Sequence, residues 1–330
     1  MNKLYYLFHR YNETFDTFVE SKSVWLRVWC FLNWMLDFLL YGTTPNDFFA
    51  YSFYKLNFWG KNEYITFRRY HMIQNRCNDK NLIKYMRDKS LFNEKFKDFL
   101  HRDSLDVNQS NKEEFVAFFK EHQSVFVKDV LGFRGKSVKM YSYDETDADT
   151  LFAQLSQDTE HHYIIEGKLL EHPDLAAFHP NSVNTIRIVT VFDDKQDVLH
   201  FMFAKLRMGN NGACVDNTHA GGISANIDLE TGIINTLGYG VKDKTTYIYH
   251  PYTGKKIPGF QIPHWKECKL YIEKAARVVP QVRYVGWDVV VLPDGGFALI
   301  EANDNADHDG QQVHNRGMWK DYKSVIKQLS

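Results

Sequence analysis

Residues 285–303 read VGWDVVVLPDGGFALIEAN, two apolar runs separated by Pro293-Asp294-Gly295-Gly296. An Asp-Gly pair between runs rich in Val, Ile and Leu predicts a hairpin of two antiparallel strands. A two-residue turn at Asp294-Gly295 places Asp288 opposite Glu301, whereas a turn at Gly295-Gly296 places Asp288 opposite Asn303. Side chains alternate along a strand with a period of two, so either register puts Asp288, Glu301 and Asn303 on one face.

Two carboxylates and a carboxamide on one face of an apolar hairpin need a partner, because buried carboxylates are costly and like charges repel. Oxygen ligands of this kind suit Mg²⁺ or Mn²⁺, and Mg²⁺ usually keeps waters and substrate phosphates as its remaining ligands. The alternatives are a solvated hairpin face or an aspartate that caps the next turn. We predict a metal site formed by Asp288, Glu301 and Asn303.

The composition of the 330-residue chain excludes several classes of protein. Lys and Arg (40) balance Asp and Glu (41), so no bulk attraction to nucleic acid is expected. The four cysteines lie far apart with no paired spacing, which argues against disulfides or a zinc site and indicates a reducing compartment. The N-terminus does not have the pattern of a secretory signal. We therefore predict a cytoplasmic protein.

Residues 1–85 are rich in aromatic side chains and lack strand-like alternation, which predicts a helical N-terminal region. Within it, Val24 to Tyr41 is apolar on most of its surface, although Arg27, Asn33 and Asp37 make it a poor membrane span. Such a helix either packs against other helices or a partner, or lies in a membrane interface. Residues 86–330 are expected to form the rest of the protein.

Residues 112–138 combine a predicted helix with a strand and a glycine loop. Lys112 to Gln123 has apolar residues at helical spacing, and Ser124 to Asp129 is a predicted strand in which Lys128 is next to last. Gly132 to Val138 contains two glycines among basic and hydroxyl residues. This loop could bring amides and cations onto phosphates, or could be a plain surface hairpin of the same composition.

Two later strands carry cations. Arg187 alternates with apolar neighbours in residues 184–192, and Lys205 and Arg207 share one face of residues 199–208. Arginines in an apolar sheet usually have an anionic partner, either a neighbouring carboxylate or a phosphate of a ligand. The segment Gly209 to Ser224, GNNGACVDNTHAGGIS, is too rich in Gly and Asn for regular structure, which favours a functional loop.

The motifs NTIRIVT, LRMG, VDN, GG, GWD and IEAN occur in this order. With them the chain resembles the ATP-grasp superfamily, and more narrowly the sugar-transfer-associated ATP-grasp proteins, which are relatives of α-L-glutamate ligases. The resemblance runs from about Ser90 to Lys320. It implies an α+β ATP-grasp fold, with a lid subdomain at about 112–166 and a catalytic subdomain at about 167–330 that clasp ATP. The chain departs from the pattern in its short lid loop and in the Asp304-Asn305-Ala306 that follows the metal strand.

The resemblance also implies roles for individual residues. ATP would contact Lys89, Lys128, the lid residues Gly132, Arg134, Gly135, Lys136 and Ser137, and the hinge residues Glu166 and Lys168, with the Glu166 carboxylate able to reach the ribose. Arg187, Arg207 and Lys205 would act on the carboxylate substrate or its acyl phosphate. Further substrate contacts would come from Asp216, Asn217, His219, Gly221 and Gly222, and Asp288, Glu301 and Asn303 match the magnesium positions.

The activity that the resemblance implies is ATP-dependent joining of a carboxylate to an amine through an acyl phosphate. The substrates would be an amino acid or other amine and a sugar or uronic acid, in surface polysaccharide biosynthesis at the inner face of the membrane. Asp216, His219 and His308 are the candidates for a general base. Two alternatives stay open: a kinase of a sugar or lipid-linked intermediate, and a non-catalytic nucleotide-binding partner of a glycosyltransferase that docks through residues 1–85.

Overall fold

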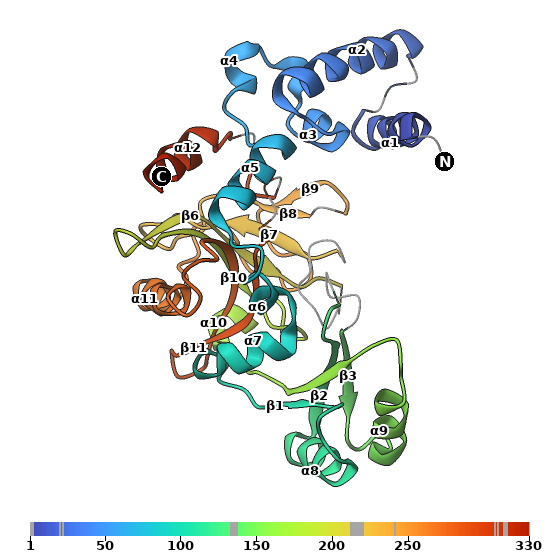
Figure 1. Ribbon diagram of the computed structural model, residues 1–330, viewed down its shortest axis with the longest axis vertical. Coiled ribbons are helices and arrows are strands. Elements are labelled where there is room, and N and C mark those ends of the chain that lie inside the picture. The colour runs from blue at the N-terminus through green and yellow to red at the C-terminus, as the bar shows by residue number, and fades with distance from the viewer. Residues whose placement is uncertain are drawn as a thin grey trace. The chain divides into compact units, whose positions relative to one another are not determined.

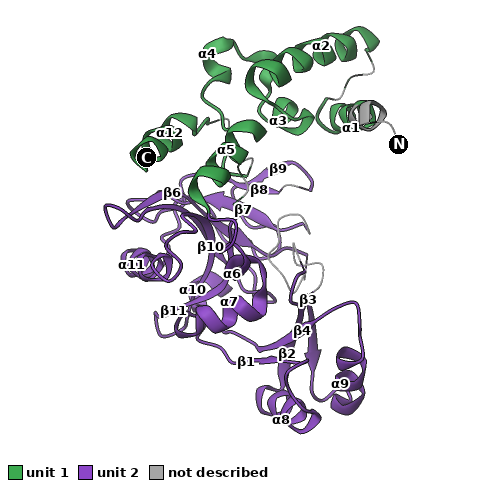
Figure 2. Cartoon of the chain, in the orientation of Figure 1, with its two compact units in different colours: residues 1–78, 305–330 green, residues 79–304 purple. Residues whose placement is uncertain are grey.

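The structure is a computed structural model that describes residues 3–19, 21, 23–132, 138–211, 221–240, 242–306, 308, 310–312 and 316–329. The chain forms two compact units (Figure 2). Unit 1 comprises residues 1–78 and 305–330, and unit 2 comprises residues 79–304. The sequence predicted a division near residue 85 with all later residues in one domain. The structure differs, because the last 26 residues belong with the N-terminal helices.

Unit 1 is helical, as predicted (Figure 1). Its elements are α1 (Lys3–Phe18), α2 (Val24–Tyr41), α3 (Pro45–Ala50), the 3₁₀ turn η1 (Phe53–Lys55), α4 (Phe58–Lys61), α5 (Phe67–Cys77) and α12 (Trp319–Gln328). The bounds of α2 follow from local chemistry: the Ser23 side chain accepts a hydrogen bond from the Leu26 amide, and Gly42 ends the helix with a φ of 68°. The core is mostly aromatic and includes Tyr11, Phe15, Trp34, Phe48 and Tyr51.

The C-terminal segment is held in unit 1 by the side-chain amide of Gln312. This buried group accepts a hydrogen bond from the Ile65 amide (2.8 Å) and donates to the Ile65 carbonyl and the Tyr51 hydroxyl (both 3.0 Å). The Trp319 amide also donates to the Glu63 carbonyl (2.8 Å). Neither contact has a periodic sequence signal, and for this reason the sequence placed these residues in the larger domain.

Unit 2 contains two antiparallel sheets. The four-stranded sheet has the order β1-β4-β2-β3, from β1 (Ser104–Asp106), β2 (Ser124–Asp129), β3 (Val138–Ser142) and β4 (Tyr163–Gly167). The seven-stranded sheet has the order β11-β10-β5-β6-β7-β8-β9, from β5 (Ile186–Asp193), β6 (Val198–Met208), β7 (Ile223–Asn226), β8 (Gly238–Gly240), β9 (Thr245–Tyr247), β10 (Tyr284–Val291) and β11 (Phe297–Asn303). The α+β fold class is thereby confirmed.

Helices supply a separate core to each sheet. α8 (Lys112–His122) and α9 (Ala148–Ser156) pack Phe115, Phe119 and Leu151 against Val125 and Ile165 of the four-stranded sheet. The seven-stranded sheet packs Ile188, Leu206 and Trp287 against α11 (Trp265–Ala276), which lies beside it in Figure 1. The remaining elements are α6 (Lys84–Arg87), α7 (Lys89–Lys95), the 3₁₀ turn η2 (Lys97–Phe99) and α10 (Pro173–Ala176).

The hairpin of β10 and β11 has the predicted pairing but not the predicted turn. The Leu292 amide donates to the Gly296 carbonyl (2.8 Å), which encloses the three residues Pro293 to Gly295, and Gly295 has a φ of +85° that favours glycine. A register shift then occurs between Asp288 and Val289, which leaves Ile300 as the extra residue of a β-bulge. The longer loop and the bulge cancel, so Asp288 lies opposite Glu301, as in the first of the two predicted registers.

Candidate active site

Charged side chains form a row across four neighbouring strands of the seven-stranded sheet. Direct pairing puts Glu301 of β11 opposite Asp288 of β10, and Asp288 opposite Arg187 of β5. Arg187 lies opposite Lys205 of β6. Directly paired residues share a face, and Arg207, two residues beyond Lys205, shares it too. The opposite face is apolar, so these charges are confined to the one face that is not packed in the core.

Asp288 is held by both arginines. Arg187 donates to Asp288 through Nε and through Nη2 (2.8 Å), and Arg207 donates through Nη1 (2.7 Å). Burial alone would raise the pKa of Asp288, but the two guanidinium groups outweigh it and hold the pKa well below its ordinary value. Of the two partners that the sequence left open for Arg187 and Arg207, the structure shows the carboxylate.

Glu301 is in a different electrostatic state. Its Oε1 accepts a hydrogen bond from the Asn303 amide (3.0 Å), and Arg187 is at 3.8 Å. Desolvation and the neighbouring Asp288 carboxylate raise the pKa of Glu301 above its ordinary value. Water still reaches the carboxylate, because 43% of the side chain is exposed. A cation beside Glu301 would relieve the repulsion from Asp288.

The predicted metal ligands therefore fit a magnesium ion only in part. Glu301 and Asn303 are in contact on one face of the hairpin, both are partly exposed, and the charge on Glu301 is under-compensated. Both Asp288 oxygens, in contrast, accept hydrogen bonds from arginines, so this carboxylate is not an open ligand as arranged. No group of three or more His, Cys, Asp or Glu side chains suited to a metal occurs among the residues that the structure describes.

On the four-stranded sheet, Glu166 is also buried between cations. Arg102 donates to its two oxygens (2.8 and 2.9 Å), Asn93 donates to Oε1 (3.1 Å), and Lys128 contacts Oε2. Burial alone would raise the pKa of Glu166, but Arg102 and Lys128 outweigh it and hold the pKa well below its ordinary value. The prediction that this carboxylate reaches a ribose differs from what we find, because the group is enclosed.

Arg102 also joins the two sheets of unit 2. Besides Glu166, its guanidinium donates to the carbonyl of Leu299 and to that of Ile300 (3.2 Å), the residues at the bulge of β11. The Arg102 side chain is only 3% exposed. The same bulge sets the position of Glu301, so Arg102 links the Glu166 cluster to the charged row. Arg102 and Asn93 were not predicted as site residues, since neither lies in a recognisable motif.

Lys89, the first residue of α7, is electrostatically coupled both to Glu166 and to Glu301 of the charged row. Its ammonium donates to the carbonyls of Asp129 (2.8 Å), Val130 (3.3 Å) and Gly132 (2.6 Å), the last of which is the first predicted lid residue. Burial lowers the pKa of Lys89, the Glu301 carboxylate opposes this effect, and the Lys128 ammonium adds to it. Lys89 is therefore within electrostatic range of both Glu301 and Lys128.

The remaining predicted residues are partly described. Lys168 is exposed after β4, and Gly221 has a φ of +110°, a conformation that favours glycine beside the buried Gly222. Seven predicted site residues lie outside the described residues: Arg134, Gly135, Lys136, Ser137, Asp216, Asn217 and His219. His308 belongs to unit 1, where its Nε2 lies 3.1 Å from Asp47 and its ring stacks on Tyr70. It is therefore a weak candidate for the general base.

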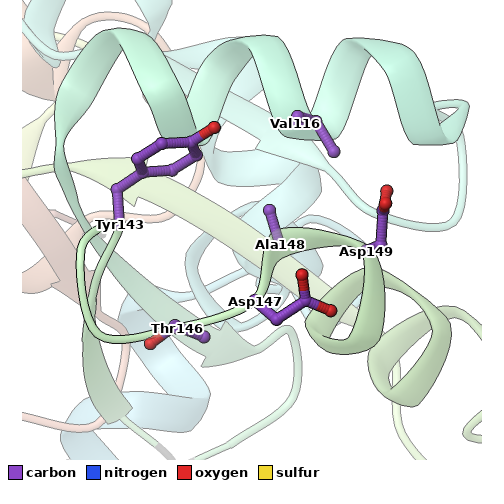
Figure 3. A pocket seen from close by; sticks show the side chains of 6 residues that line it. All are labelled: Val116, Tyr143, Thr146, Asp147, Ala148 and Asp149. Carbon is purple, nitrogen blue, oxygen red and sulfur yellow. The ribbon is translucent and has the colours of Figure 1, made fainter.

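A hollow of about 250 Å³ lies elsewhere in unit 2 (Figure 3). It is lined by Val116 of α8, Tyr143, Thr146, Asp147, Ala148 and Asp149. None of these is a predicted site residue. Asp147 is occupied as the N-cap of α9, where it accepts from the Thr150 amide (2.9 Å). This hollow does not bear on the candidate active site.

Comparison with known proteins gives the family. The chain belongs to the sugar-transfer associated ATP-grasp family, whose model matches residues 68–327. The resemblance noted in the sequence is thereby confirmed. Comparison with curated protein sequences found no match.

Solved structures of ATP-grasp enzymes are similar at low identity. One is the ATP-grasp ligase PsnB complexed with a minimal precursor (16% identity, TM-score 0.48, 77% of this chain and 64% of that chain). Another is D-alanyl-alanine synthetase A from Vibrio cholerae (11%, 0.44, 74% and 64%). A third is the ADP complex of N5-carboxyaminoimidazole ribonucleotide synthetase (10%, 0.48, 80% and 59%). The chain thus spans less than two thirds of the length of each of these proteins.

Proposed function

We propose that this protein is an ATP-dependent carboxylate-amine ligase that attaches an amino acid or other amine to a sugar or uronic acid in surface polysaccharide biosynthesis. Membership of the sugar-transfer associated ATP-grasp family supports the ATP dependence and the sugar context. Cys30 and Cys268 are free and buried, which supports a cytoplasmic location.

The observation that carries the proposal is the charged row, in which two arginines lie beside two carboxyl groups whose pKa values are shifted in opposite directions. In the first step a carboxylate oxygen of the substrate attacks the terminal phosphorus of ATP, and ADP leaves. In the second step the amine attacks the carbonyl carbon of the acyl phosphate, inorganic phosphate leaves, and the nitrogen loses a proton. Both steps concentrate negative charge, and cations placed in advance are the main means of stabilising it.

The candidate site residues that the structure describes have the following roles in this scheme. Arg187 and Arg207 project from adjacent strands, and their planar guanidinium groups can hold the substrate carboxylate in a two-pronged contact. Lys89 and Lys128 would contact the phosphates or the adenine of ATP. Glu301 and Asn303, joined by Asp288 once an arginine moves to the substrate, would hold magnesium, which supplies charge neutralisation on the phosphates when bound.

Product analysis with purified protein, ATP and magnesium tests the proposal against a panel of amines and uronic acids. ADP, inorganic phosphate and a new amide, identified by mass spectrometry, are expected. ADP with a phosphoryl group retained on the acceptor would instead identify a kinase. Nucleotide binding without turnover across the panel would identify a non-catalytic partner of another enzyme. Glu267→Gln, an exposed position on α11, is the matched control for Glu301→Gln in this assay.

A further inference from the structure

The helix α2 of unit 1 exposes apolar side chains, where an ordinary surface helix exposes polar ones. Ten of its 18 residues are exposed and all ten are large and apolar: Val24, Trp25, Val28, Trp29, Leu32, Met35, Leu36, Phe38, Leu39 and Leu40. Surface helices normally turn charged and polar residues to water. The helix α11 of unit 2 does so with Lys266 and Glu267. An apolar face of this size marks a contact surface.

Both charged residues of α2 form ion pairs with other residues of unit 1. Asp37 is buried, and both its oxygens accept hydrogen bonds from the Lys61 ammonium (2.9 and 2.8 Å). Arg27 pairs with Asp16 and donates to Asn12 (2.9 Å). Neither of these two charged side chains is among the ten exposed side chains of α2, so the outward face of the helix itself is apolar.

Aromatic residues extend this face at one end of α2. Phe58 of α4 contacts the Tyr41 ring (centroids 6.1 Å apart), so α4 lies beside the C-terminal end of α2. Phe58 and Trp59 are 57% and 76% exposed, and Trp25 is 85% exposed. Exposed tryptophans are characteristic of the boundary between lipid and water, because the indole ring is apolar and its N–H is polar.

The net charge of each unit indicates that the surface bound by α2 is anionic. Unit 1 carries 13 Lys and Arg against 9 Asp and Glu, a net charge of +4, so unit 2 carries −5 of the total of −1. The exposed guanidinium of Arg68 donates to the carbonyls of Phe38 (3.0 Å) and Leu39 (3.3 Å) and places a cation at the end of the apolar face. An anionic bilayer attracts this unit and repels the other.

We propose that unit 1 binds the surface of an anionic phospholipid bilayer, with the outward face of α2 and the exposed aromatics of α4 inserted at the level of the headgroups. By length and composition alone α2 could cross a membrane, with a mean hydropathy of 1.2. Its other side, however, is packed in the unit 1 core through Cys30, Trp34, Asp37 and Tyr41, which a lipid-spanning helix could not retain. The helix therefore lies in the plane of the surface. This inference does not depend on the proposed enzymatic activity.

Co-sedimentation of the full-length protein with vesicles tests the proposal. Vesicles of mixed phosphatidylcholine and phosphatidylglycerol should bind the protein, and vesicles of phosphatidylcholine alone should bind it less well. The triple variant Trp25→Ser, Leu32→Ser, Leu36→Ser should lower the affinity at least about tenfold. Its melting temperature should stay near the wild-type value, because all three side chains are exposed. The matched control is Val198→Ser, Ile248→Ser, Leu270→Ser, which removes exposed apolar residues of unit 2 and should bind as wild type.

A second measurement locates the contact. Lipids brominated in the acyl chain should quench the tryptophan fluorescence of the bound wild-type protein. The variant Trp25→Phe, Trp29→Phe keeps the face apolar, so it should bind normally but lose much of the quenching.

Three results would overturn the proposal. The first is that the folded wild-type protein does not bind anionic vesicles, and the second is that the triple variant binds them as well as wild type does. The third is that the protein self-associates through α2 in place of binding vesicles. Light scattering would detect this third result as an oligomeric wild-type protein and a monomeric triple variant.

Discussion

Two glutamates of unit 2 differ in the charges that surround them, and the difference separates a structural group from a candidate functional one. Glu166 is buried and contacted by Arg102, Lys128 and Asn93, and its pKa is lowered. Glu301 is partly exposed, lies opposite another carboxylate, and has a raised pKa. The first carboxylate is fully compensated by the protein. The second is compensated by Arg187 only in part, so a cation from outside would stabilise it, which is the property expected of a ligand site.

The largest effect that this comparison predicts is on turnover by Glu301→Gln. The substitution keeps the shape of the side chain and removes the charge that would hold magnesium. We therefore expect ligase turnover to fall by about 1,000-fold or more. Steady-state ADP release measures the loss, and circular dichroism should show an unchanged fold. Normal turnover in this variant would remove the metal assignment.

Arg102→Ala should have the largest effect on stability. The substitution leaves Glu166 buried beside Lys128 and Asn93 only, and removal of one partner of a buried ion pair costs about 3–5 kcal/mol of unfolding free energy. Urea unfolding measures this cost. The control is Arg277→Ala, whose partner Asp197 is exposed and whose loss should cost about 1 kcal/mol or less. Equal losses in the two variants would contradict the structural role assigned to the Glu166 cluster.

Arg207→Lys should have an intermediate effect, on catalysis. One ammonium cannot contact Asp288 and a substrate carboxylate in the way that a planar guanidinium can, so we expect kcat/KM to fall by about 10- to 100-fold. The melting temperature should change little, because a cation still faces Asp288. Arg277→Lys serves as the control, and activity within twofold of it would exclude a two-pronged contact by Arg207.

The smallest predicted effect is a difference in the pH dependence of stability. Glu301 has a raised pKa in the folded state, so wild type binds more protons folded than unfolded between its ordinary value of 4.5 and the folded pKa. Wild type should therefore lose stability relative to Glu301→Gln as the pH rises through and above about 4.5. Urea unfolding of both proteins from pH 4 to 7 without magnesium measures the free energy of unfolding of Glu301→Gln minus that of wild type. This difference should increase with pH. A difference that decreases with rising pH would mean that the protein already compensates the charge of Glu301.

The hairpin shows how far sequence reasoning reaches. The apolar runs and the Asp-Gly turn predicted the two strands and the common face of Asp288, Glu301 and Asn303, and both are confirmed. The turn length was wrong, because loop closure by Leu292 and Gly296 depends on the position of the bulge at Ile300. That bulge is contacted by Arg102, 197 residues away from Leu299, and local sequence carries no information on such a contact.

The sequence by itself determined the strands and helices with clear periodicity, the alternation that puts Arg187, Lys205 and Arg207 on one face, and the family. It also determined the full length of α2, Val24 to Tyr41, because caps and periodicity are local properties. Only the tertiary structure decided which carboxylate the arginines bind, that Glu166 is enclosed, and that the apolar side of α2 faces outward. These depend on charges and surfaces brought together from distant parts of the chain, where pairing and burial, not spacing along the sequence, set the energy.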